Sequence, residues 1–351
     1  MSSRQAGQLR GRDDEDAPVR GRCEVLSRRR EGAYWTLTFA AKEIAERARP
    51  GQFVQIGVGA PHTLLRRPFS IARVSRQGAS AGTVDVVFDV HGPGTEWLSK
   101  VEGHDTVEVV GPLGKPFPLP QRQVNCLLIG GGYGVAPLFL LAEHLTRQRL
   151  RVDMLVGASS LDRLLGVVES KRLSASAVFT TDDGSYGEQG QVTDVLDDVL
   201  DRTGAGVVYA CGPNPMLAAV SQRCAEREVP VQVAVEELMG CGIGVCFTCV
   251  MPVRGKDQKV RMKRACVDGP VFNGSRIAWD VSRYAVPVTS DGPTTPGGTG
   301  ESEGPEGPGT PGESGGPAAS AAPGESGGPA GPDAPGRPAD ARGERAVWGD
   351  A

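Results

Sequence analysis

Four of the eight cysteines in this 351-residue sequence are grouped around position 250. Cys241, Cys246 and Cys249 follow one another with C-x4-C-x2-C spacing, and Cys266 comes after 16 intervening residues. This is the spacing of the plant-type 2Fe–2S ligand set, in which three thiolates on one loop and a fourth further along bind a small inorganic core. The pattern therefore predicts a 2Fe–2S cluster with these four cysteines as metal ligands.

The remaining cysteines, at positions 23, 126, 211 and 224, are scattered and form no disulfide-like framework. The sequence has no run of 18 apolar residues, and residues 1–19 lack the apolar core of a secretory signal. We therefore expect a cytoplasmic protein without a membrane span, where clustered cysteines favour metal binding over disulfides. A zinc site or free thiols are the alternatives, although zinc motifs usually pair two C-x2-C knuckles and this sequence has one.

Two segments in the first hundred residues could hold a phosphate-bearing cofactor. Residues 66–71 read RRPFSI at a predicted strand end, where an arginine can neutralise a pyrophosphate and a serine can hydrogen-bond a ring nitrogen. Residues 86–98 read VVFDVHGPGTEWL, a strand that ends in a glycine-rich turn before a short helix. Gly94 and Thr95 would offer donors to a phosphate there; the alternative is an ordinary turn in which Thr95 caps the helix.

Two further turns have the context of a nucleotide-binding loop. Residues 127–145 read LLIGGGYGVAPLFLLAEHL, a strand, a glycine turn and a helix in that order, with GGGxG rather than GxGxxG spacing. Residues 209–217 read YACGPNPML at another strand end, and TTDDGS at 180–185 ends the strand between them. The alternatives are tight turns without a ligand and, for Cys211, a plain buried small residue.

The periodicity of the chain predicts two folded domains and a short third piece. Residues 21–120 contain six short stretches rich in β-branched and aromatic residues, typical of an antiparallel barrel, and residues 95–101 could be a short helix. From residue 122, apolar strands alternate with helical patterns, which indicates a parallel sheet covered on both faces. Residues 239–285 are too few and too rich in Cys and Gly to build an ordinary core without a staple.

The composition changes sharply near residue 290. Residues 291–351 contain 28 Gly or Pro, repeat the stretch PGESGGPA, and are predicted to be a disordered tail because they cannot bury enough apolar surface. The formal net charge of the whole chain is −4, and the tail is strongly acidic, so the rest is close to neutral. A body without a strong positive charge argues against nucleic acid as a partner.

These motifs occur in a fixed order along the chain: RPFS, GPGT, GGGYGVAP, TDDGS, CGPNPM and then the cysteine run. In that order they resemble the ferredoxin–NADP reductase superfamily over residues 20 to 285. Within it, the sequence EELMGC before the cluster cysteines is similar to the electron-transfer subunits of two-subunit, NAD-dependent dihydroorotate dehydrogenases. The resemblance implies an FAD-binding β-barrel domain (20–120), an NAD-binding α/β domain (121–235) and a 2Fe–2S subdomain (236–285). The composition predicts a disordered N-terminus (1–19) and a disordered Gly/Pro-rich tail (286–351) on either side of them.

The resemblance also implies roles for individual residues, and it implies no catalytic side chain. The residues that match FAD-contacting positions are Arg67, Pro68, Phe69, Ser70, Val87, Phe88, Asp89, Gly94 and Thr95, with Arg67 toward the pyrophosphate and Ser70 near the isoalloxazine. The residues that match the nicotinamide nucleotide side are Gly130, Gly131, Gly132, Gly134, Cys211, Gly212 and Pro213. Two departures stand out: the tail has no counterpart, and Tyr133 takes a loop position usually held by a small aliphatic residue.

The implied function is electron transfer. FAD exchanges hydride and a 2Fe–2S cluster passes single electrons, so a chain with both converts between the two kinds of electron traffic. In the resembled enzymes, electrons from an FMN-containing catalytic subunit cross the cluster and FAD to NAD during pyrimidine (UMP) synthesis, in a heterotetramer. The alternatives are a reductase subunit for a hydrogenase, glutamate-synthase-like or oxygenase partner, a non-enzymatic cluster-bearing sensor, and a zinc-binding interaction module.

Overall fold

A computed structural model describes residues 17–61 and 63–281 of the chain. The described residues all belong to one unit. The predicted disordered tail, residues 286–351, and all but the last three residues of the predicted disordered N-terminus lie outside them.

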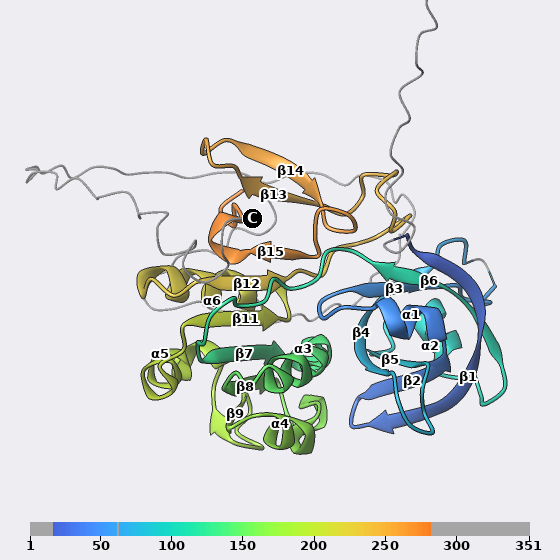
Figure 1. Cartoon of the computed structure of the whole chain (residues 1–351), viewed down its shortest axis with the longest axis horizontal. Coiled ribbons are helices and arrows are strands. Elements are labelled where there is room, and N and C mark those ends of the chain that lie inside the picture. The colour runs from blue at the N-terminus through green and yellow to red at the C-terminus, as the bar shows by residue number, and fades with distance from the viewer. Residues whose placement is uncertain (1–16, 62, 282–351) are drawn as a thin grey trace, which may run out of the picture. The chain divides into compact units, whose positions relative to one another are not determined.

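Six strands form a closed antiparallel barrel, drawn in shades of blue to blue-green in Figure 1. They are β1 (Val19–Glu31), β2 (Tyr34–Ala40), β3 (Phe53–Ile56), β4 (Arg67–Ser75), β5 (Thr83–Phe88) and β6 (Thr106–Leu113), in the order β1-β2-β5-β4-β3-β6. Alternate residues such as Leu37, Val54, Ile56 and Val86 point inward and are fully buried. The predicted six-stranded barrel is therefore confirmed.

Two short helices accompany the barrel. A short helix is predicted for residues 95–101. The observed helix α2 (Pro93–Leu98) begins two residues earlier than predicted and ends three residues earlier. Helix α1 (Lys42–Arg47) was not predicted, although its face with Ile44 and Ala45 is buried against the barrel.

A seven-stranded sheet follows, and all of its strands except β15 are parallel, as predicted for the main sheet. The sheet is made of β7 (Cys126–Gly131), β8 (Val152–Ala158), β9 (Ser176–Thr181), β10 (Glu188–Gln189), β11 (Val207–Cys211), β12 (Val231–Ala234) and β15 (Val271–Asn273), in the order β10-β9-β8-β7-β11-β12-β15. The helices that connect the parallel strands are α3 (Ala136–Arg147), α4 (Val167–Leu173), α5 (Val192–Thr203) and α6 (Asn214–Glu226). The chain runs outward from β7 to β9 and then returns to β11 on the other side, so β7 and β11 flank a topological switch point.

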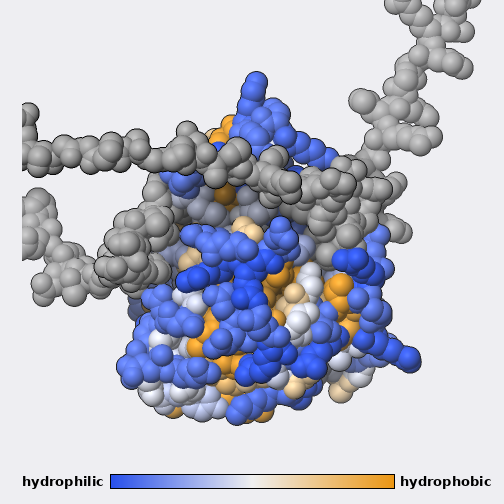
Figure 2. Space-filling view, turned by 90° about the vertical axis from the view of Figure 1, so that its left-hand side faces the viewer, coloured by the Kyte–Doolittle hydropathy of each residue, from blue (hydrophilic) through white to orange (hydrophobic). Residues whose placement is uncertain are grey.

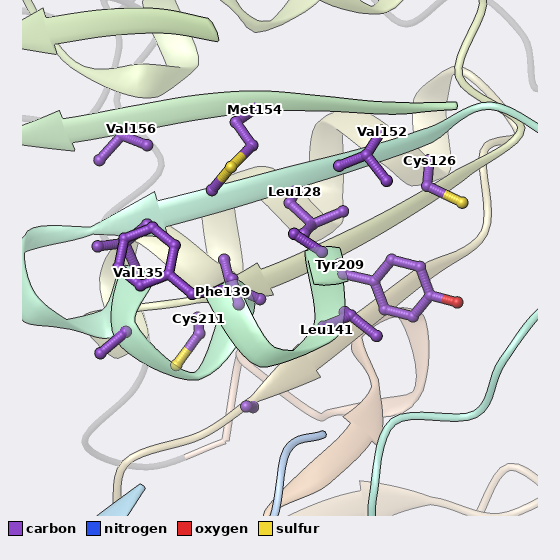
Figure 3. Close-up of a cluster of buried hydrophobic side chains, with 14 of the residues drawn as sticks. Cys126, Leu128, Val135, Phe139, Leu141, Val152, Met154, Val156, Tyr209 and Cys211 are labelled. Carbon is purple, nitrogen blue, oxygen red and sulfur yellow. The ribbon is translucent and has the colours of Figure 1, made fainter. Parts of the chain in front are cut away.

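The two faces of this sheet are covered by different helices, which explains why its strands are apolar throughout. Figure 3 shows part of the first face, where side chains of β7, β8 and β11 pack against α3, among them Leu128, Met154 and Phe139. On this face the Tyr209 hydroxyl donates to the backbone oxygen of Pro118, 2.9 Å away, and thereby anchors the connection from the barrel. The second face is covered by α5 and α6.

The C-terminal piece has no separate core. Strands β13 (Val250–Arg254) and β14 (Val260–Arg264) form a hairpin, shown in orange in Figure 1. Strand β15 pairs antiparallel with β12 and so extends the large sheet. Met251, Phe272 and Ile277 are buried in the same apolar cluster as residues of α5 and α6. A short cysteine-rich segment is thus held in part by packing on the neighbouring domain.

Polar residues cover most of the face shown in Figure 2, and apolar residues appear in several groups between them. Within residues 17–61 and 63–281, no helix has the length and apolar character needed to cross a membrane.

Candidate functional site

The four predicted ligand cysteines lie in two neighbouring segments. Cys241, Cys246 and Cys249 are on the loop between β12 and β13, and Cys266 follows β14. The backbone N–H of Ala265 donates to the backbone oxygen of Cys249 at 2.7 Å, which brings the fourth cysteine beside the third. Cys249 and Cys266 are buried, Cys241 is partly buried and Cys246 is exposed.

The loop directs hydrogen-bond donors at its own sulfur atoms. The backbone N–H groups of Ile243, Val245 and Cys246 donate to Cys241 Sγ at 3.5, 3.3 and 3.4 Å. The Thr248 hydroxyl donates to Cys246 Sγ at 3.2 Å. Hydrogen bonds favour the thiolate, and those from Thr248, with further ones from Cys241, lower the pKa of Cys246 to about 6.

The sulfur environment fits a two-iron cluster, because the cysteines fall into two pairs. Cys246 Sγ accepts from the backbone N–H of Cys241 at 3.4 Å, whereas Cys266 neighbours Cys249. Burial, and then the nearby Cys249 sulfur, raise the pKa of Cys266 to about 12. Among the described residues, no three His, Cys, Asp or Glu side chains are placed to hold a single ion. A 2Fe–2S cluster shares four thiolates between two irons, and the donors around Cys241 and Cys246 suit its negative charge.

The predicted pyrophosphate residues come together at the start of α2. A Cβ placed on Gly94 would lie 3.0 Å from Arg67 Nε, so the guanidinium lies directly against the glycine turn. The Thr95 hydroxyl, however, accepts from the backbone N–H groups of His91 and Gly92 at 2.9 and 3.3 Å. The N-cap of α2 is thus Gly92 and not Thr95, which lies inside the helix and accepts from the backbone of the capping turn. Arg67 and Gly94 form a cradle with the charge to hold a phosphate.

The other residues predicted to contact FAD divide between the core and the surface of the barrel. Phe69 and Phe88 are buried and pack on each other with ring centroids 5.6 Å apart, so only their backbone groups can face a ligand. Pro68 and Val87 are partly buried and Ser70 is exposed. Ser70 pairs with a residue of β3 and is free to contact a flavin on the outer face of the barrel.

Asp89 has a partner that the sequence did not predict. Its carboxylate lies 3.0 Å from Arg163, whose backbone oxygen accepts from the Tyr34 hydroxyl at 3.0 Å. The backbone N–H of Gly166 donates to Glu31, also at 3.0 Å. These contacts tie the segment between β8 and α4 to the barrel. Because the partners are 74 or more residues apart, no local sequence pattern could have found them.

The two predicted nicotinamide turns meet at the switch point. Gly130 in β7 is paired with Cys211 in β11. A Cβ on Gly134 would lie 2.7 Å from the backbone oxygen of Cys211 and 2.7 Å from Gly212 Cα. A Cβ on Gly131 would lie 2.9 Å from the ring of Pro213. Close approach of the two turns therefore requires glycine, whether or not a ligand binds. Gly132, with φ +55°, adopts a left-handed conformation.

Tyr133 lies at the centre of a polar group in front of these turns. Its hydroxyl donates to the two carboxylate oxygens of Glu236, 2.9 and 3.1 Å away, and its ring meets the Tyr34 ring edge-on at 5.6 Å. Burial and the Glu236 charge raise the pKa of Tyr133. The same two causes raise the pKa of Cys211 to about 12, so its thiol stays protonated near neutral pH. Glu236 is the first residue of the EELMGC stretch quoted above, but its hydrogen bond with Tyr133 was not predicted.

Comparison with known proteins agrees with this geometry. Residues 236–278 match the iron–sulfur cluster binding domain of dihydroorotate dehydrogenase B, and residues 128–222 match the oxidoreductase NAD-binding domain. The chain is 38% identical to the electron transfer subunit of dihydroorotate dehydrogenase B (NAD(+)) from Desulforamulus reducens, over 70% of this chain and 92% of that one. The subunit of the same name from Geobacillus kaustophilus is also 38% identical, over 69% and 92%.

Two solved structures are also similar. That of an NADH-dependent reduced ferredoxin-NADP oxidoreductase matches with a TM-score of 0.65 and 33% identity, over 74% of this chain and 90% of that one. The ferredoxin reductase of carbazole 1,9a-dioxygenase, at a TM-score of 0.52 and 21% identity, covers 62% of this chain and 69% of its own and shows a shared fold alone.

The barrel, the parallel sheet and the cysteine loop together define an iron–sulfur flavoprotein of the ferredoxin-reductase type, an oxidoreductase that uses FAD, a 2Fe–2S cluster and NAD. Within that class, the chain belongs to the family of dihydroorotate dehydrogenase B (NAD(+)) electron transfer subunits.

Proposed function

We propose that this chain carries electrons from an FMN-containing, dihydroorotate-oxidising subunit to NAD in pyrimidine (UMP) synthesis. The bound 2Fe–2S cluster would supply one-electron transfer and the bound FAD would supply hydride exchange with NAD. The chain's own residues bind and orient these groups. Cys241, Cys246, Cys249 and Cys266 would hold the cluster, and Arg67 with Gly94 would hold the FAD pyrophosphate.

The observation that carries this proposal is the packing of the cluster loop directly on the barrel. Gly242, between two ligand cysteines, lies against the side chain of Gln55 in β3. Strand β3 is hydrogen-bonded to β4, which contains the predicted flavin residues. The backbone N–H of Lys115, just after β6, donates to Gly269 at 2.6 Å, three residues after Cys266. Electron transfer requires a short separation between carriers, and the packing of the cluster loop on the barrel supports such a separation.

Apolar side chains around the cysteines support docking of a partner subunit. Ile243, Val245 and Phe247 lie on the loop that contains Cys241, Cys246 and Cys249, and they are 54%, 72% and 61% exposed; nearby Leu238 is 73% exposed. We propose that this group of four, which we call the cluster rim, contacts the FMN subunit. Exposed apolar side chains grouped around a functional centre are typical of interaction sites.

The decisive experiment is co-expression of the tagged chain with an FMN-containing dihydroorotate dehydrogenase subunit from the same genome, under anaerobic conditions. We expect a stable heterotetramer that contains iron, FAD and FMN and reduces NAD with dihydroorotate. The chain alone should bind iron and FAD and exchange hydride with NADH, but it should not oxidise dihydroorotate. Recovery of only an oxygenase component, or a complex with no NAD-linked dihydroorotate oxidation, would contradict the proposal.

One alternative has a specific observation in its favour. The NADH-dependent ferredoxin-NADP oxidoreductase structure is 33% identical over 90% of its chain, so a reductase subunit for a different flavoprotein partner is the second candidate. The same purification separates the two, because the partner recovered would then be a glutamate-synthase-like protein and the complex would not oxidise dihydroorotate. We further propose a cytoplasmic location, the domain boundaries 20–120, 121–235 and 236–285, and the nicotinamide-side roles of the Gly130–Gly134 and Cys211–Pro213 turns.

A further inference from the structure

Gln55 lies on the outer face of the barrel, toward the cluster loop. Along β3, Val54 and Ile56 are buried in the barrel core. Phe53, on the opposite face, belongs to the apolar cluster that contains Cys249. Because side chains alternate along a strand, Gln55 points to the same side as Phe53.

The carboxamide of Gln55 is buried without a partner in the protein. Gln55 is 1% exposed, and neither its Nε2 nor its Oε1 has a hydrogen-bond partner. Gln52, three residues earlier and 6% exposed, differs: its Nε2 donates to Gly114 O and its Oε1 accepts from Arg49 N, both at 2.8 Å. Buried polar groups in native proteins almost always have a partner, so the Gln55 amide indicates a partner outside the chain.

The position of the amide shows where that partner would be. A Cβ on Gly242 would lie 2.8 Å from Gln55 Cγ and 2.9 Å from its Cδ, and closer still to Nε2. Gly242, at φ +70°, directly follows Cys241, whose sulfur already accepts three backbone N–H donors. The donor end of Gln55 therefore lies beside the loop that surrounds the first cysteine pair.

The same side chain lies beside the predicted flavin strand. Gln55 is directly opposite Pro68 in the β3–β4 pair, and Phe53 is opposite Ser70. Residues that face each other across an antiparallel pair project to the same side of the sheet. Gln55 thus lies between the strand that would contact the flavin and the loop that would hold the cluster.

We propose that Gln55 tunes the cluster: its Nε2–H donates a hydrogen bond to a cluster sulfur on the Cys241 side. The inference rests on the proposed function, because it requires the cluster to be bound. Hydrogen bonds to cluster sulfurs stabilise the more negative, reduced form and so raise the reduction potential. Gln55 is not a metal ligand; it sets the potential at which the cluster exchanges electrons with the flavin.

The test uses the full chain with cluster and FAD bound. Gln55→Met keeps the length of the side chain but removes the donor, and Gln52→Met is the matched control with partners inside the protein. Redox titration followed by EPR of the reduced cluster should show a lower potential for Gln55→Met and the wild-type potential for Gln52→Met. Equal potentials for wild type and Gln55→Met would overturn the inference and leave the proposed function intact.

A second measurement does not depend on the variant keeping its cluster. Wild-type chain labelled with 15N only in glutamine side chains should show a 15N coupling to the reduced cluster in pulsed EPR, and Gln52→Met should retain it. If wild type shows no such coupling, Gln55 has no contact with the cluster. A chain that takes up no iron at all after anaerobic reconstitution would instead contradict the proposed function, and the role of Gln55 would be rejected with it.

Discussion

The four cysteines proposed as cluster ligands differ in what surrounds their sulfur atoms. Cys246 is exposed and its thiolate is stabilised by Thr248, whereas Cys249 and Cys266 are each 1% exposed. Burial raises the pKa of Cys266 to about 12, so bound iron, and not the protein, would keep that thiol deprotonated.

Replacing one buried ligand should remove the cluster. In Cys249→Ser the hydroxyl is a poor ligand for iron in this site, and we expect loss of most of the iron and of the visible cluster absorption. Cys224→Ala is the control, because Cys224 is also buried but lies on α6 among apolar side chains. This control should keep its iron and lose about 1 to 3 kcal/mol of stability. Iron contents that are equal in the two variants would exclude Cys249 as a ligand.

At this scale, sequence reasoning works where the signal is local. The four cysteines could be proposed as ligands from the sequence because the spacing of a ligand set follows from the size of the cluster; their role stays a prediction. The link between Tyr133 and Glu236 was not, because the two residues are 103 positions apart. Gln55 was also missed: within FVQI it looks like one polar position of a strand, and only the fold brings Gly242 against it.

At the scale of elements, the turns after β7 and β11 form one unit, because each fills the space that a side chain on the other would need. In Gly134→Ala the new Cβ would meet backbone atoms of Cys211 and Gly212, neither of which can rotate away. We expect a loss of about 1 to 3 kcal/mol in stability and weaker NADH binding, measured by thermal unfolding and by titration of flavin reduction.

The control for this prediction is Gly21→Ala. A Cβ on Gly21 in β1 would have nothing within 4 Å, and Gly21 has no positive φ. This variant should keep NADH affinity and stability close to wild type. An effect on NADH binding of equal size in both variants would show that the close approach of the two turns does not shape the nucleotide site.

The cluster rim makes a separate prediction about docking. In Val245→Glu a charge replaces an apolar side chain that is 72% exposed, and we expect partner affinity to fall about tenfold or more because the charge would be buried in the interface. Val168→Glu on α4 is matched, since Val168 is 79% exposed. Surface plasmon resonance with the FMN subunit should show weaker binding for Val245→Glu than for Val168→Glu. Equal affinities would place the interface elsewhere.

Element prediction failed where pairing or backbone geometry is not local. Between β8 and β9, Gly166, at φ +67° and close to the Phe139 ring, separates a 3-10 turn at Leu161–Arg163 from α4, and the sequence analysis did not predict this break. Strand β15 has three residues, too few for a periodic signal, and exists because β12 offers it an open edge. The long apolar strands and amphipathic helices, in contrast, were predicted because burial on both faces leaves a continuous signal.

At the scale of the whole molecule, the thiols outside the cluster are all buried, and this makes stability depend on alkaline pH. Burial raises the pKa values of Cys126, Cys211 and Cys224 from a reference value of 9.0 to about 12. In the unfolded chain these thiols lose their protons near pH 9, whereas in the folded chain they hold them. The stabilisation is therefore complete below pH 9 and is lost as the pH rises toward 12.

Cys224 allows this linkage to be measured for a single group. Its folded pKa is raised by burial and then by Asp197, so wild type should lose about 1.4 kcal/mol per pH unit more than Cys224→Ala between pH 9 and 12. Urea unfolding of both proteins with reductant present should show wild type more stable at pH 7 and the difference shrinking steadily above pH 9. Asp197→Gln should reduce this loss of stability with pH only slightly, because burial contributes more than Asp197 to the raised pKa of Cys224. Parallel stability curves for wild type and Cys224→Ala across this range would mean that the thiol ionises as readily in the fold as in the unfolded chain.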